Sequence, residues 1–185
     1  MLGQGKTVFQ AEIDAACELI DFWRFNVQHL ASAMVYQPIS TADSDNGYMH
    51  RGLEGFVAAV SPFNFTAIGG HLASAPAFMG NTVLWKPSDT ALLSNYVVYQ
   101  ILEEAGLPPG IIQFLPTKGE DFGRTITGSP HLAAITFTGS TKTFKVRTKE
   151  CPFDRKRSIL RWNLDPLEMG SRSSRSLSNV SAFNR

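Results

Sequence analysis

The sequence predicts an α/β fold, a parallel sheet with helices on both faces. Short apolar runs alternate with helical stretches through the middle of the 185 residues, which is the pattern of successive βαβ units. Right-handed crossovers of this kind cover a parallel sheet on both sides, and its strands are then apolar throughout rather than alternating. The predicted strands cover residues 55–60, 82–85, 111–115 and 133–137.

Helices are expected before the first strand and in each crossover. In the first helix, apolar residues such as Ile13, Cys17 and Ile20 recur at three- and four-residue spacing, which is typical of an amphipathic helix. The third helix stops at Gly106, with two prolines shortly beyond it, as helices commonly do. The predicted helices cover residues 10–30, about 66–79, about 90–105 and 121–127.

Composition and charge exclude several classes of protein. Hydrophobic residues make up 43% and charged residues 18% of the chain, which is typical of a globular domain. The net charge of +1 gives no overall attraction to nucleic acid or to a membrane surface, and we expect neither as a partner. Two cysteines and four histidines without ligand spacing predict no disulfide framework and no metal site.

The last forty residues differ from the rest. Residues 142–185 carry 11 Lys and Arg against 4 Asp and Glu, whereas residues 1–141 carry 6 against 12. The later segment is also rich in Ser and shows neither helical nor strand periodicity. We therefore predict a domain over 1–145 and a basic, Ser- and Arg-rich tail over 146–185 that is disordered.

Candidate site residues follow the predicted strands, since ligands of parallel sheets bind beyond the carboxyl ends of their strands. Asn64 follows the first strand, where its side-chain amide could donate to a developing oxyanion, although turn-forming asparagines are frequent. Lys86 and Asp89 follow the second, where they suit ribose hydroxyls and phosphate, or simply a solvated strand end. Gly139 follows the fourth strand, so the backbone there could approach a phosphate, though an ordinary strand-to-helix turn looks similar.

Four motifs in a fixed order resemble the aldehyde dehydrogenase superfamily, and the 1-pyrroline-5-carboxylate dehydrogenase branch within it. The resemblance is found in residues 3 to about 145. Further likeness to that branch comes from residues 3–7, 10–16 and 51–56. The four motifs are Ser61-Pro62-Phe63-Asn64-Phe65, Leu84-Trp85-Lys86-Pro87-Ser88, the stretch from Glu104 to Gly110, and Phe137-Thr138-Gly139-Ser140.

This resemblance implies an incomplete Rossmann-like NAD-binding domain and a role for each matching residue. Asn64 would stabilise the oxyanion, while Ser61 and Lys86 would contact NAD, the lysine near the adenosine ribose. The segment Gly139, Ser140, Thr141, Lys142 and Thr143 would carry the pyrophosphate. The activity implied is oxidation of L-glutamate γ-semialdehyde to glutamate in proline catabolism, in the mitochondrial matrix, although no targeting peptide is visible in the chain.

The family's nucleophilic cysteine and its general-base glutamate belong to Gly-Gln-x-Cys and Glu-Leu-Gly-Gly stretches, and neither stretch occurs in these 185 residues. We therefore expect this chain to be inactive alone, because loss of one member of a catalytic unit costs many orders of magnitude in rate. The alternative is a non-catalytic interaction fragment that mixes with full-length subunits in a homo-oligomer.

Overall fold

The computed structural model describes residues 1–141 and 143–144, together with the backbone of 158–162. Its centre is a parallel sheet of five strands in the order β3-β2-β1-β4-β5. The predicted α/β class is thereby confirmed, and each predicted strand is present within two residues of its expected bounds. The strands are β1 (Phe56–Val60), β2 (Thr82–Lys86), β3 (Ile112–Phe114), β4 (Leu132–Thr138) and β5 (Ser158–Trp162).

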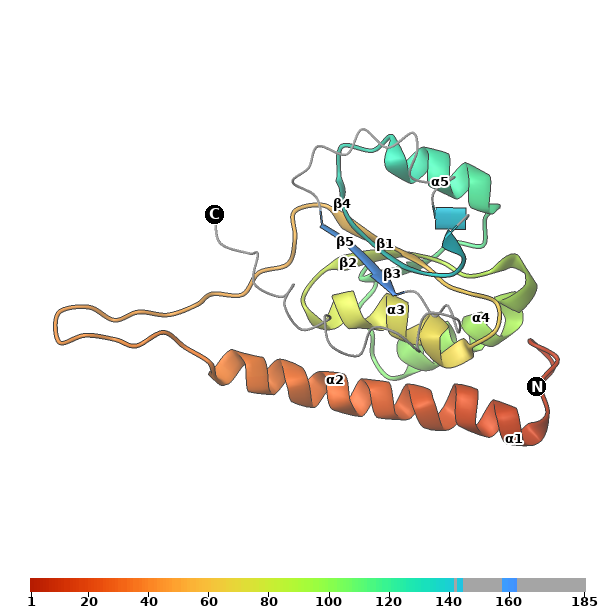
Figure 1. Ribbon diagram of the computed structural model, residues 1–185, viewed down its shortest axis with the longest axis horizontal. Helices are drawn as coiled ribbons and strands as arrows, with labels where there is room; N and C mark the ends of the chain where they lie inside the picture. The colour runs from red at the N-terminus through yellow and green to blue at the C-terminus, as the bar shows by residue number, and fades with distance from the viewer. Residues whose placement is uncertain (142, 145–157, 163–185) are drawn as a thin grey trace, which may run out of the picture.

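Helices cover both faces of this sheet, as Figure 1 shows. The helix α5 lies over one face, whereas α3 and α4 cover the opposite face, and the long N-terminal helix runs outside α3. The helical segments are α1 (Val8–Ala11), the π-helix η1 (Glu12–Cys17), α2 (Glu18–Val35), α3 (Thr66–Phe78), the 3₁₀-helix η2 (Asp89–Ala91), α4 (Leu92–Glu104) and α5 (Gly119–Thr127).

Each face of the sheet has its own apolar cluster. On the α3 side, Trp85 and Val83 are fully buried against Ala67 and Ile112. On the α5 side, strand residues pack against Phe122 and its neighbours on the helix. Burying apolar area on both faces is what stabilises a parallel sheet and holds its strands in register.

The register of β1 sets the position of the candidate site. Val60, the last residue of β1, pairs with Lys86 in β2 and with Phe137 in β4. The three strands therefore end at the same level, and the loops that follow them meet at one edge of the sheet. The N-terminal residues lie at this same end of the molecule (Figure 1).

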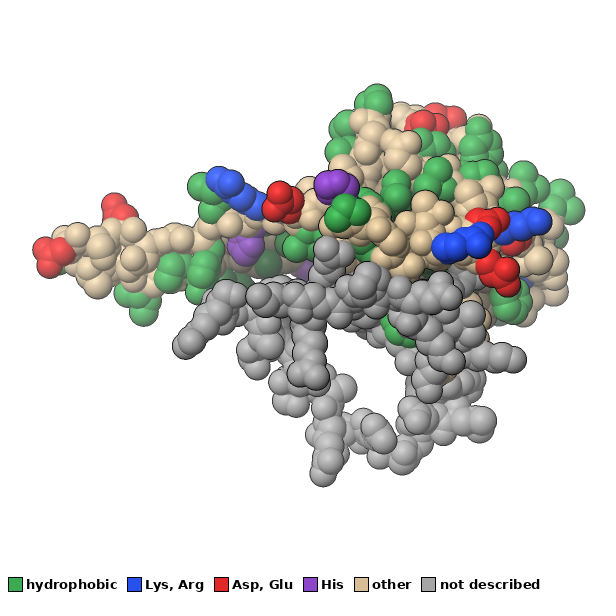
Figure 2. Space-filling model, turned by 90° about the horizontal axis from the view of Figure 1, so that it is seen from above, with side chains coloured by type: hydrophobic (Ala, Val, Ile, Leu, Met, Phe, Trp, Pro, Cys, Tyr) green, Lys and Arg blue, Asp and Glu red, His purple; other side chains and the backbone are tan. Residues whose placement is uncertain are grey.

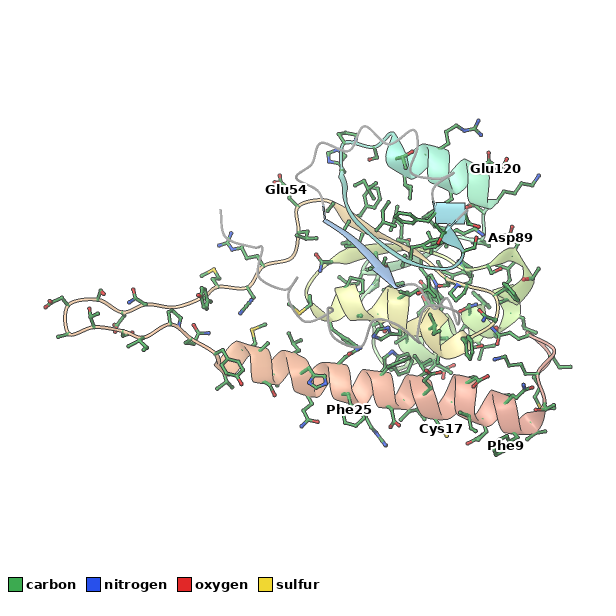
Figure 3. All side chains as sticks on the ribbon, viewed as in Figure 1. Phe9, Cys17, Phe25, Glu54, Asp89 and Glu120 are labelled. Atoms are coloured by element: carbon green, nitrogen blue, oxygen red, sulfur yellow. The ribbon has the colours of Figure 1, made fainter. Side chains whose placement is uncertain are left out.

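The first helix is longer than predicted, and its buried side differs from the expected one. Helical backbone runs from Val8 to Val35 through the π-helical turn. Leu19 is buried and Phe22 and Trp23 pack against the core, whereas Cys17 is exposed. Cys17, one of the apolar residues from which the amphipathic helix was predicted, is therefore not in the core, because the helix is apolar on two sides and only one of them packs against α3. In Figure 3, Phe9 and Cys17 lie on the side turned away from the sheet.

The tail prediction needs correction at one segment. Residues 158–162 form β5, which pairs in parallel with β4 from Ala134 to Thr138. These five residues are therefore part of the sheet and not disordered. The sequence analysis missed this strand because it is short and has basic residues around it. The seven-residue β4 has an edge available for pairing with it. The rest of 146–185 lies outside the described residues.

Between α2 and β1 the chain makes a long arm that projects away from the sheet (Figure 1). An isolated antiparallel bridge between Thr41 and Ser44 closes its tip, and Asp43 and Asp45 lie there. Figure 2 shows acidic side chains at this projecting end and mixed acidic and basic groups at the other. Within the described residues, no helix is long and apolar enough to cross a membrane.

Candidate cofactor site

A cavity of about 450 Å³ opens at the edge where β1, β2 and β4 end. It brings together the loops that follow β1, β2 and β4, in which the sequence analysis placed the candidate site residues. The loop after β3 does not line it. The lining residues are Val60, Ser61, Pro62, Phe63, Asn64, Phe65, Ile68, Lys86, Ser88, Phe137, Thr138, Gly139, Ser140 and Thr143.

Lys86 is the only positively charged lining residue of this cavity among the described residues. The residue is 4% exposed, and its Nζ lies 2.7 Å from Oδ1 of Asp89, whose own side chain is 60% exposed. A buried ammonium needs a partner, and Asp89 supplies one from the first residue of η2. Asp89 is labelled in Figure 3, where it lies at the carboxyl end of the sheet. The burial of Lys86 at the cavity wall disfavours its interpretation as a solvated strand end.

Ser61 forms the floor of the cavity through two hydrogen bonds. Its Oγ accepts a 2.7 Å bond from Nε1 of the fully buried Trp85 and donates to the carbonyl of Gly69 at 3.3 Å. The side chain thus ties β2 and α3 to the end of β1. With its hydroxyl hydrogen already donated, a direct contact between Ser61 and NAD stays a prediction.

Asn64 lies in the loop between β1 and α3, two residues before the helix begins. It is exposed and lines the cavity, and among the described residues no hydrogen bond is formed by its side chain. Its Nδ2 is therefore available to a ligand. Asn64 and Lys86 line one cavity, which is the arrangement expected from the sequence.

Gly139 and Ser140 form the turn after β4. A Cβ added at Gly139 would lie 2.8 Å from Cζ of Phe137, so a side chain there would collide with the ring. Oγ of Ser140 accepts a bond from the amide of Thr143 at 3.2 Å, and the Ser140 carbonyl accepts one from Phe144. Ser140 therefore caps a helical turn as an N-cap residue does, which confirms the predicted helix start after Gly139.

The remaining predicted positions are only partly accounted for. Thr143 lines the cavity and Thr141 does not, while Lys142 lies outside the described residues. Sequence reasoning did not single out Phe63, Phe65 or Ile68, which line the cavity as well. No group of three or more potential metal ligands occurs in the part of the chain that the structure describes.

Comparison with known proteins defines the class. The aldehyde dehydrogenase family model matches residues 1–161, so the chain belongs to the aldehyde dehydrogenase family. The match extends past the boundary predicted at residue 145 and includes most of β5.

Within the family, the relatives of this chain include several 1-pyrroline-5-carboxylate dehydrogenases. The human mitochondrial enzyme is 67% identical over 145 residues, which is 78% of this chain and 26% of the relative. The corresponding enzyme of Emericella nidulans is 54% identical over 146 residues. The crystal structure of the Mycobacterium tuberculosis enzyme bound with NAD is 48% identical, with a TM-score of 0.83 over 88% of this chain and 31% of that one. The chain thus spans about a quarter to a third of the length of these relatives.

Proposed function

We propose that this chain forms the NAD-binding portion of a 1-pyrroline-5-carboxylate dehydrogenase. That enzyme oxidises L-glutamate γ-semialdehyde to glutamate in proline catabolism. The single observation that carries the proposal is the shared cavity, which is lined by the buried Lys86 and by Asn64, whose amide is free among the described residues. The mitochondrial names of the relatives support the mitochondrion, with the matrix as the proposed compartment.

The residues present fit a dinucleotide. Lys86 supplies a cation beside hydrogen-bonding groups, which suits the ribose. At Gly139 no side chain covers the backbone, and Gly139, Ser140 and Thr143 line the cavity at the end of β4, where a pyrophosphate would lie. We assign Ser61, Lys86, Gly139, Ser140, Thr141, Lys142 and Thr143 to contacts with NAD.

Asn64 is assigned the stabilisation of charge. When a thiolate adds to an aldehyde, the carbonyl oxygen becomes an oxyanion, and a donor already in place lowers the barrier. Nδ2 of Asn64 can donate to that oxygen without first giving up a partner within the described residues. Bound NAD would accept the hydride. The thiolate and the base that activates water would come from stretches that these 185 residues do not contain.

We therefore propose that the chain binds NAD and does not oxidise an aldehyde by itself. Titration calorimetry of the purified chain with NAD tests the first part. Sub-millimolar, saturable binding is expected, and an absence of binding at millimolar NAD would contradict it. Incubation with glutamate semialdehyde and NAD tests the second part, and clear NADH formation would overturn it.

The Lys86→Met variant sharpens the binding test. It removes the charge and keeps an apolar stem of similar length, so we expect NAD affinity to fall about tenfold or more, as for a lost bond to a charged group. Lys118→Met is the matched control, since Lys118 is exposed and does not line the cavity. Equal NAD affinities for the two variants would show that Lys86 does not contribute to NAD binding.

An exposed apolar stripe on the first helix favours a second candidate, a fragment that mixes with full-length subunits. Ile20, Val27 and Met34, which recur every seven residues on α2, are 40–53% exposed, and exposed apolar surface of this kind commonly marks an interface. Co-purification of the tagged chain with the full-length enzyme would support it. A chain that elutes alone from such a mixture would contradict it.

A further inference from the structure

We propose that the N-terminal segment, residues 3–6, is a strap that positions Asn64, with Gln4 and Lys6 as positioning residues on either side of it. The inference deepens the proposed function and rests on it, because the purpose of the strap depends on the oxyanion role of Asn64. The contacts themselves are independent of any cofactor.

Gln4 holds the residue just before Asn64. Its Nε2 donates a 3.0 Å hydrogen bond to the carbonyl of Phe63. Phe63 is itself 64% exposed and forms no other hydrogen bond with the described residues. A bond from a residue 59 positions earlier in the chain therefore restrains a peptide unit directly attached to Asn64.

Lys6 holds the residue just after Asn64. Its Nζ lies 4.1 Å from the centroid of the Phe65 ring, within the range of a cation–π interaction. The same ammonium is paired with Asp14, and the two side chains are 16% and 23% exposed. Because Asp14 belongs to the rigid helix, the ion pair fixes the cation over the ring.

The strap is itself anchored at both ends. At Gly3 an added Cβ would lie 2.9 Å from the backbone nitrogen of Ser94, so the segment packs directly on α4. At its other end, Thr7 begins the long helix with a reciprocal capping box to Gln10. Gly5 turns the chain between these anchors with a φ of 62°, a conformation that favours glycine.

Acidic groups around Lys6 support the same arrangement. Glu18 lies one helical turn beyond Asp14, and burial raises its pKa, with the charge of Asp14 adding to the effect and that of Lys6 opposing it. Lys6 thus neutralises a partly buried acidic pair while it covers Phe65. This accounts for a half-buried lysine at a position that binds no cofactor in our assignment.

Nitrogen-15 relaxation of the whole chain tests the strap. In wild type the backbone amides of residues 63–65 should be rigid, with order parameters near 0.85. In Gln4→Glu, which keeps the shape and removes the donor, and in Lys6→Met, which removes the cation, they should fall below about 0.6. Chymotryptic cleavage after Phe63 should accelerate roughly three- to tenfold. Unchanged order in both variants would overturn the inference.

Three further measurements separate positioning from general stability. Lys6→Arg retains a cation that stacks on aromatic rings, so it should restore the order lost in Lys6→Met. Lys6→Met should have no further effect in a Phe65→Leu background, because the ring that it acts through is gone. The indole signal of Trp85 should stay unchanged in both variants, and the urea midpoint should stay unchanged in Gln4→Glu, whose hydrogen bond is exposed. A general loss of structure in both variants would contradict the inference.

The outcome is independent of whether NAD binds. The relaxation measurements use the chain without cofactor, so a strap that orders the loop stands even if calorimetry finds no NAD binding. Conversely, if NAD binds and the order parameters of residues 63–65 are unchanged in every variant, the proposed function is supported and the strap inference is contradicted.

Discussion

The indole nitrogen of Trp85 donates a 2.7 Å hydrogen bond to Oγ of Ser61. Both residues are buried, and the bond joins the last residues of β2 to the first residue after β1. The floor of the candidate cofactor site is therefore a hydrogen-bonded part of the core. Stability and the shape of the site depend on the same pair of atoms.

The Ser61→Ala substitution should lower the free energy of unfolding by about 1–3 kcal/mol. It leaves the buried Nε1 of Trp85 without its acceptor, and an unsatisfied buried donor has a cost of that size. Urea unfolding followed by tryptophan fluorescence measures the change. Ser88→Ala is the control, because its hydroxyl meets only the exposed Thr90 and its loss should cost less than about 0.5 kcal/mol.

The Gly69→Ala substitution should destabilise the chain by about 1–3 kcal/mol, as overpacking of a core does. A Cβ at Gly69 would lie 2.2 Å from Oδ1 of the fully buried Asn95, so α3 and α4 would have to separate. Gly128→Ala is the matched control. Gly128 ends α5 with a φ of −79° that alanine adopts readily, so this change should leave stability unaltered or raise it slightly. Equal urea midpoints for the two variants would contradict the close approach.

Stability should decrease in mild acid because of His71. Burial lowers its pKa below the usual 6.5, and its ring lies 4.4 Å from that of Phe22, between α3 and α2. As the pH falls through 6.5, the unfolded chain takes up the proton first, so unfolding is favoured until the pH drops below the folded-state pKa. His71→Gln should remove this part of the pH dependence, measured by thermal unfolding at several pH values. His50→Gln should not, since His50 is exposed.

Proline substitutions test whether β5 is a strand. In an edge strand, successive amides point alternately towards the neighbouring strand and away from it, and proline has no amide hydrogen to donate. One of the two variants Ile159→Pro and Leu160→Pro should therefore lose a backbone hydrogen bond to β4. Its free energy of unfolding should be about 1 kcal/mol lower than that of the other variant. Urea unfolding of the two variants measures the difference. Equal stabilities would contradict the pairing with β4.

Local pattern was sufficient for the order of the first four strands and for the edge of the sheet at which the predicted site residues lie. Asn64, Lys86 and Gly139 each lie at or just after the end of a strand. These strands are short apolar runs bounded by Gly, Pro or polar residues, and such patterns can be recognised from a few neighbouring residues. Loops at the carboxyl ends of parallel strands necessarily meet, so the sequence already placed these three residues at one edge.

Tertiary structure decided what depends on contacts between distant residues. The first helix is apolar on two sides, and only packing on α3 selects Leu19 and leaves Cys17 exposed. The pairing of β5 with β4 depends on an available strand edge rather than on periodicity in 158–162. The bond from Gln4 to Phe63 spans 59 residues, and no local signal encodes it, because such a contact exists only once the sheet has brought the two loops together.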